Sequence, residues 1–167
     1  MRGAAALAIP VLCAVLQVTI VRFVSVGEAH PDLLALVVVS WSLIAGAAQG
    51  MTWAFAGGLT ADLLGSAAFG ATTVSLLPIG LGFGVRDRTG GDPTIVAGAF
   101  LVGAGAVAHQ LTQAVVLVLV GASLPPLGIL LAGGVGTGIY TGTLALVGYP
   151  LLRLLHRRTA REPAFDW

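Results

Sequence analysis

Four long stretches without a single charged residue dominate this chain and leave few folds open to it. They span residues 3–21, 33–61, 63–85 and 93–152. Only 9% of all residues are charged, whereas a soluble domain carries about 25%. This pattern excludes an ordinary soluble globule, a disordered chain and a disulfide scaffold. Because a transmembrane helix needs roughly 20 apolar residues, the stretches predict an all-α polytopic membrane protein, a bundle of six transmembrane helices.

Glycine, proline and polar residues mark where these stretches divide into helices. The connections fall at 22–30, 46–50, 65–70, 86–93 and 121–126. The predicted helices are 4–21, 32–47, 51–64, 71–85, 94–120 and 127–156. Pro31 and Asp32 open the second helix, because proline fits a first helical turn and a carboxylate there meets the positive end of the helix dipole. The third predicted helix is short for a full span.

The arginines predict which side of the membrane each end faces. With six spans, both termini and the connections 46–50 and 86–93 share one side, and that side holds every basic residue except Arg22. Because basic loops stay in the cytoplasm, both termini are predicted to be cytoplasmic. Residues 1–156 then form a six-helix transmembrane domain, and residues 157–167 form a short basic cytoplasmic tail.

The residue content argues against several classes of site. The net charge is only +1 and no basic stripe is present, which excludes nucleic-acid binding. The single cysteine, Cys13, lies in an apolar stretch and is expected to be structural. His109 has no evident serine or acid partner in the sequence, and the histidines have no metal-binding spacing. We therefore expect no catalytic residue, no metal and no cofactor.

Polar residues inside the apolar segments have both a structural and a functional interpretation. Asp62 either binds an ion or a partner, or has a structural role in which its carboxylate reaches the membrane interface or caps the following helix. His109 and Gln113 are four residues apart and so share one helix face. Together with Gln110 and Tyr140, they either fix the bundle through interhelical hydrogen bonds or line a polar cavity for a ligand.

Small residues recur at four-residue spacing along several predicted helices. Gly50, Ala54 and Gly58 share a strip with Asp62 on the third helix, and Gly134, Gly138 and Gly142 repeat the spacing on the sixth. Such strips let helix backbones approach closely in lipid. The strips serve packing within one bundle, or offer a groove to a partner's transmembrane helix, and both uses can hold on different faces.

Two segments carry a resemblance to a known family. PDLLALVVV at 31–39 and GGLTADLLG at 57–65, followed by Phe69 and Gly70, resemble the MreD family of bacterial rod shape-determining membrane proteins. The length, the six-helix topology and the basic tail agree with that family. The resemblance assigns structural or partner-contact roles to six residues that match its pattern: Pro31, Asp32, Gly58, Asp62, Gly65 and Gly70.

The resemblance implies a non-enzymatic scaffold of the cell-elongation machinery in the bacterial cytoplasmic (inner) membrane. Such a scaffold maintains rod shape and supports lateral peptidoglycan synthesis by binding an MreC-like bitopic membrane protein. The glycosyltransferase, the transpeptidase and MreB-like filaments would be reached indirectly. The alternative is a small-molecule (vitamin-type) binding subunit of an energy-coupled transporter. Such S-components are also small six-helix proteins with a similar architecture, and a cavity lined by Asp62, His109, Gln113 and Tyr140 would then hold the substrate.

Overall fold

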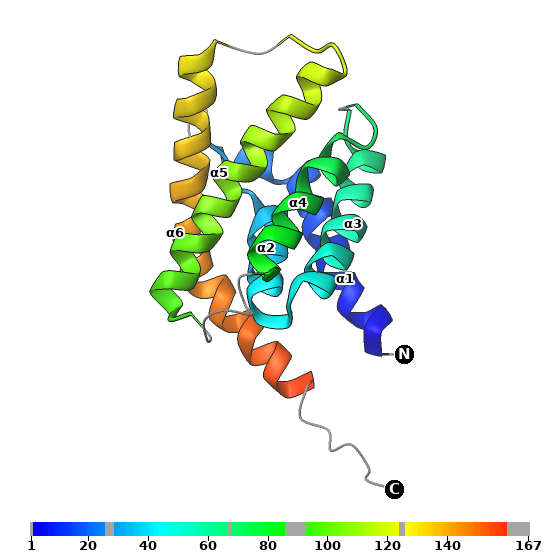
Figure 1. Ribbon diagram of the computed structural model, residues 1–167, viewed down its shortest axis with the longest axis vertical. Coiled ribbons are helices and arrows are strands. Elements are labelled where there is room, and N and C mark those ends of the chain that lie inside the picture. The colour runs from blue at the N-terminus through cyan, green and yellow to red at the C-terminus, as the bar shows by residue number, and fades with distance from the viewer. Residues whose placement is uncertain (1, 26–28, 67, 86–92, 124–125, 160–167) are drawn as a thin grey trace, which may run out of the picture.

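The computed structural model describes residues 2–25, 29–66, 68–85, 93–123 and 126–159, and it is built from α-helices (Figure 1). The elements are α1 (Arg2–Thr19), the short 3-10 helix η1 (Val21–Phe23), α2 (Leu33–Ala45), α3 (Ala47–Leu64), α4 (Ala71–Val85), α5 (Ile95–Leu119) and α6 (Leu127–Thr159). The predicted all-α class and the number of six helices are confirmed. Most of the predicted connection 86–93 lies outside the described residues.

Helix α2 is the centre of the bundle. Every residue from Leu34 to Leu43 is buried, and α2 packs against each of the other five helices. This position explains its sequence, because a helix that is apolar on all sides is one that is surrounded. With 13 residues, α2 is about 20 Å long. Its neighbours shield it on all sides, so this central helix does not have to match the thickness of a bilayer by itself.

The turn between α2 and α3 is tighter than the sequence suggested. Gly46 alone separates the two helices, with a φ of +85°, a conformation that glycine adopts without strain. The prediction that the third helix is short and begins at 51 is therefore wrong, since α3 begins at Ala47 and has 18 residues. Trp41 and Trp53 stack across the turn with ring centroids 4.1 Å apart, which holds the two helices together.

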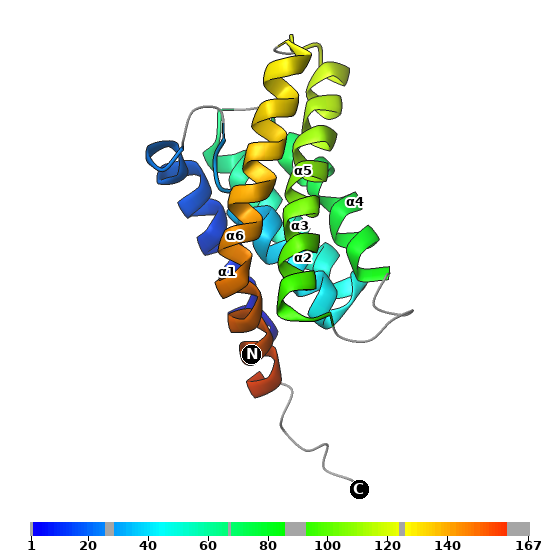
Figure 2. The ribbon, with the colours of Figure 1, turned by 90° about the vertical axis from the view of Figure 1, so that its left-hand side faces the viewer.

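Successive helices alternate in direction between the two ends of the bundle (Figures 1 and 2). The start of α1, the α2–α3 turn, the end of α4, the start of α5 and the end of α6 lie at one end, and α5 and α6 extend beyond the others at the opposite end. This alternation agrees with the order of connections on which the six-span prediction rests. Helix α6 runs to Thr159, three residues beyond the predicted end of the sixth helix.

Only two of the described helices are both long and apolar enough to cross a membrane, judged by length and composition: Ile95–Leu119 and Leu127–Arg158. Their helices, α5 and α6, have 25 and 33 residues, or roughly 37 and 50 Å. Shorter apolar helices cover Leu7–Thr19, Leu33–Ala45 and Ala71–Val85. Six complete spans remain a prediction.

Glycines make the closest helix contacts within the bundle. A Cβ atom added to Gly58 of α3 would lie 2.7 Å from Cα of Thr73 in α4. A Cβ atom at Gly103 of α5 would lie 2.8 Å from the carbonyl oxygen of Gly138 in α6. Real Cβ atoms do not approach other atoms so closely, so both positions require glycine. The predicted glycine strips thus serve packing inside this chain on these faces.

Candidate functional site

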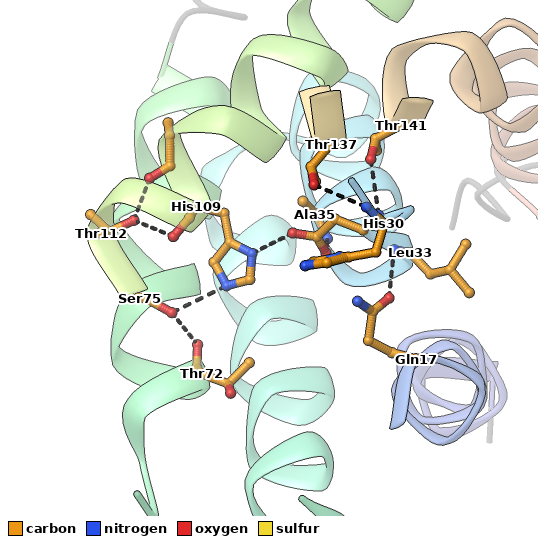
Figure 3. Close-up of polar contacts among 12 residues, drawn as sticks. Gln17, His30, Leu33, Ala35, Thr72, Ser75, His109, Thr112, Thr137 and Thr141 are labelled. Carbon is orange, nitrogen blue, oxygen red and sulfur yellow. Dashed lines mark hydrogen bonds and ion pairs between the residues drawn. The ribbon is translucent and has the colours of Figure 1, made fainter. Parts of the chain in front are cut away.

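A buried polar network centred on Asp32 and His109 lies where α2, α4, α5 and α6 meet (Figure 3). Asp32 is only 4% exposed and caps the start of α2, where its Oδ1 accepts a hydrogen bond from the Ala35 N–H at 2.9 Å. Its other oxygen, Oδ2, lies 2.6 Å from Nδ1 of His109 on α5. One carboxylate therefore both starts the central helix and ties it to α5.

The second ring nitrogen of His109 also has a partner. Nε2 lies 3.1 Å from Oγ of Ser75 on α4, and this hydroxyl donates to the carbonyl oxygen of Thr72 at 3.0 Å. The expectation that His109 lacks a serine and an acid partner is thus wrong. The partners are 34 and 77 residues away along the chain, so no local spacing could have disclosed them.

The order Asp32, His109, Ser75 resembles that of a hydrolase triad, in which the histidine lies between the acid and the nucleophile. Its surroundings do not suit that chemistry. Ser75 is 0% exposed, and its hydroxyl proton is directed to the Thr72 carbonyl oxygen. A nucleophile must reach its substrate, and this one is enclosed by packed helices. The arrangement is a buried network that joins helices, and we assign no catalytic role to its residues.

Side chains from α1 and α6 hold the segment that enters α2. Thr141 Oγ1 accepts from the Asp32 N–H at 2.9 Å, and Thr137 Oγ1 accepts from the His30 N–H at 3.3 Å (Figure 3). On the opposite side, Gln17 Oε1 accepts from the Leu33 N–H at 2.7 Å. Gln17 and Ser75 were not among the sequence candidates, and no contact could be assigned to Thr137 or Thr141 from the sequence. Their only signal is that each is a polar residue within an apolar stretch.

Asp62 occupies the structural position that the sequence left open. Near the end of α3, its Oδ1 accepts from the Thr72 N–H at 2.9 Å, and its Oδ2 accepts from the Thr73 N–H at 2.9 Å and from the Thr73 hydroxyl at 2.6 Å. The first N–H groups of a helix have no partner within it. Asp62 therefore caps α4 from a neighbouring helix, and the adjacent α4 amides offset its unfavourable place at the end of α3.

The other family-pattern residues lie at turns and close contacts. Pro31 is buried just before α2. Gly65 ends α3 with an extended backbone, at φ −83° and ψ 169°. Gly70 has a φ of +87° directly before α4, which favours glycine. With Gly58 against Thr73, these positions shape the α3–α4 pair.

A polar cavity of about 270 Å³ opens beside the network. It is lined by Gln17, Val18, His30, Asp32, Leu34, Ala61, Gly65, Ser66, Thr72, His109, Gln110 and Gln113. The predicted cluster is thus only partly assembled. His109, Gln110 and Gln113 line the cavity, but Tyr140 lies outside it and donates to the carbonyl oxygen of Val24 at 3.4 Å. Asp62 also lies outside, since it is used as a cap.

A family model described as rod shape-determining protein MreD matches residues 4–158, which include every residue of the network and of the cavity. The chain belongs to the MreD family. Neither the curated proteins nor the solved structures contain a match. MreD proteins are shape-determining membrane proteins and are not known as enzymes, which agrees with the enclosed position of Ser75.

The structure gives a physical reason for the two aspartates in the MreD-like segments. Asp32 caps α2 and Asp62 caps α4, so each acid starts the helix that follows a connection. Among the described residues of this MreD chain, no group of three or more His, Cys, Asp or Glu residues could hold a metal ion. The half-buried Cys13 is a free thiol.

Proposed function

We propose that this MreD-family chain is a non-enzymatic membrane scaffold of the bacterial cell-elongation machinery. In this role it maintains rod shape and supports lateral peptidoglycan synthesis by binding an MreC-like bitopic membrane protein. The glycosyltransferase, the transpeptidase and MreB-like filaments are reached through that partner. The family match over residues 4–158 carries the proposal.

The use of the polar residues supports a scaffold. Asp32, His109 and Asp62 form hydrogen bonds with groups of α2, α4 and α5 in the same chain. Ionisable groups in a bilayer often mark a transport pathway, but these three groups fix helices to one another. A protein whose polar groups hold it rigid is suited to presenting constant helix faces to partners.

An apolar groove between α5 and α6 offers a face for the partner's transmembrane helix. It encloses about 440 Å³ and is lined by Val96, Ala99, Phe100, Gly103, Ala104, Val107, Val135, Gly138, Ile139, Gly142, Thr143 and Leu146. Gly103 and Gly138 let the two backbones approach closely, while Phe100 and Ile139 are largely exposed. Small residues between larger apolar ones are typical of helix–helix interfaces in membranes.

The proposal includes a six-span arrangement in the cytoplasmic membrane with both termini in the cytoplasm. The alternating helix directions and the arginine distribution support it. Helices α2 and α4 are shorter than the hydrocarbon core, at roughly 20 and 22 Å against about 30 Å. The bundle accommodates this difference by enclosing α2 and by local thinning of the bilayer beside α4.

Affinity purification of the detergent-solubilised protein from its own host tests the proposal. We expect an MreC-like bitopic protein among the partners recovered. The polar cavity supports a second candidate, the small-molecule binding subunit of an energy-coupled transporter. Recovery of an ATPase-coupling module in place of the MreC-like protein would favour that candidate and contradict the scaffold.

A further inference from the structure

Two residues in the wall of the polar cavity carry side-chain polar atoms that have no hydrogen-bond partner among the described residues. Within the described part of the chain, three buried side-chain polar atoms have no hydrogen-bond partner: His30 Nδ1, Ser40 Oγ and Gln110 Oε1. Two of them, on His30 and Gln110, belong to residues that line this one cavity. An unsatisfied buried polar atom costs roughly 1–3 kcal/mol. Their concentration in a single cavity indicates that the space is built for an occupant.

The chemistry of the wall defines what that occupant offers. The Gln110 Oε1 atom is an acceptor, and His30 Nδ1 is an acceptor when the ring proton is on Nε2. The Asp32 carboxylate lines the same cavity. Neither lysine nor arginine is among the lining residues, so an anion would find no strong cationic partner there. The wall therefore favours a ligand that donates hydrogen bonds.

We propose that this cavity binds a primary ammonium group, with the Asp32 carboxylate, Gln110 Oε1 and His30 Nδ1 as its acceptors. An ammonium group has three N–H donors and no acceptor, which matches three acceptors in a wall that holds neither lysine nor arginine. Its charge is also attracted by the carboxylate, and hydrogen bonds between charged groups are stronger than neutral ones.

Two sources can supply this group: the aminoethyl headgroup of a phospholipid and a free soluble amine. The cavity lies toward the end of the bundle where α3 ends, since Gly65 and Ser66 form part of its wall. Lipid headgroups lie at the ends of a membrane-spanning bundle, so this position favours the lipid source. That preference rests on the six-span arrangement proposed above, whereas the ammonium site itself does not.

Paired ligands that differ only in their N–H groups test the site. Ethanolamine carries three N–H donors, and choline carries the same charge with none. We expect calorimetric titration of the full-length protein in detergent to show saturable binding of ethanolamine and at least tenfold weaker binding of choline. Native mass spectrometry from nanodiscs with equal phosphatidylethanolamine and phosphatidylcholine provides the lipid arm, in which selective retention of the former identifies a headgroup as the source. Binding of ethanolamine without lipid selectivity identifies a soluble amine.

Matched variants assign the site to the cavity. Gln110→Met keeps the side-chain length and removes the acceptor, and we expect ethanolamine or lipid binding to weaken about tenfold or more. Gln49→Met makes the same substitution near the start of α3, at the other end of the bundle. It removes the acceptor of the Trp41 indole N–H there but leaves the cavity unchanged, so this variant should bind as the unaltered protein does. The proposal is overturned if the unaltered protein binds neither probe or does not distinguish ethanolamine from choline. Either result would mean that ordered water, and not an ammonium group, satisfies the polar atoms of the cavity. The six-span arrangement is tested separately with a topology reporter, so its failure can be distinguished from failure of the ammonium site.

Discussion

At the residue scale, the Asp32–His109 pair is the centre of the molecule. Both side chains are about 95% buried, and each ring nitrogen of His109 faces an oxygen, on Asp32 and on Ser75. The Ser75 hydroxyl in turn donates to the carbonyl oxygen of Thr72, so the pair belongs to a chain of contacts that runs from α2 through α5 to α4. A buried pair of this kind adds little net stability over apolar packing, but loss of one partner leaves the other uncompensated.

Replacement of Asp32 by asparagine separates the two duties of this residue. Asparagine caps helices about as well as aspartate, so the start of α2 should persist while the carboxylate facing His109 is lost. We expect Asp32→Asn to lower the free energy of unfolding in detergent by about 3–5 kcal/mol, the cost of breaking a buried pair. Denaturant titration followed by circular dichroism measures this change.

Two further variants make that measurement decisive. His109→Gln removes the other partner of the pair, and the double variant should lose less than the sum of the single losses, since the two residues act as one unit. Additive losses, or an Asp32→Asn variant as stable as the original protein, would show that the contact between Asp32 and His109 contributes nothing.

How much of this network the sequence could predict depends on the kind of contact. Asp32 was predictable as the opening of a helix because its cap is local, three residues from Ala35. The positions of Ser75 and Thr141 were not predictable, because they depend on how α4 and α6 are rotated about their axes. Thr141 is 109 residues from Asp32 along the chain. Asp62 was left with two interpretations for the same reason.

At the element scale, close backbone contact determines how α3 and α4 pack. Gly58 lies directly against Thr73 in the first turn of α4. Asp62 accepts hydrogen bonds from the N–H and the hydroxyl of the same residue. The glycine contact and the aspartate cap therefore depend on the same spacing between the two helices. The family resemblance includes Gly58 and Asp62 in one segment, and the structure shows why they act together.

Gly58→Ala should disturb this contact. The added Cβ would lie 2.7 Å from Cα and 3.0 Å from N of Thr73, and backbone atoms cannot move aside as a side chain can. We expect a loss of about 1–3 kcal/mol, as for other overpacked sites, measured as a lower midpoint of thermal unfolding in detergent.

Gly82→Ala on α4 is the matched control, because a Cβ atom there meets nothing within 4 Å. It should leave the midpoint unchanged or raise it slightly, since alanine is the better helix former. Equal midpoints for the two variants would contradict the close α3–α4 contact.

The helix boundaries also show what a sequence can disclose. Five of the six helices begin and end within about three residues of the predicted positions, as expected where caps and turns are local. The start of α3 was misplaced by four residues, because a glycine with positive φ can reverse a chain within one residue. The segment 46–50 contains two glycines, and only the structure shows which one is the turn.

At the scale of the whole molecule, the bundle is asymmetric. Helices α5 and α6 are long, largely exposed and apolar, whereas α2 is enclosed. Exposed apolar side chains on α5 and α6 are suited to contact with lipid or with another transmembrane helix. The interior of the bundle therefore holds the helices together, and the long α5–α6 hairpin presents the exposed apolar faces.

Topology is the first property to test at this scale. A reporter fused after the last residue should be active in the cytoplasm. Every arginine except Arg22 lies on the predicted side of the bundle that holds both termini, and basic segments stay in the cytoplasm. A reporter fused within 121–126 should be active outside the membrane. A C-terminal reporter that is active outside would contradict the six-span arrangement.

The measurement closest to the central claim compares two substitutions on one helix. Ala104 lines the α5–α6 groove, and Ala97 is exposed on α5 outside it. Co-purification of an MreC-like partner, quantified against the recovered amount of this chain, should fall at least fivefold in Ala104→Trp and stay unchanged in Ala97→Trp. Equal recovery with both variants would show that the groove is not the partner site, and absence of the partner with the unaltered chain would contradict the scaffold itself.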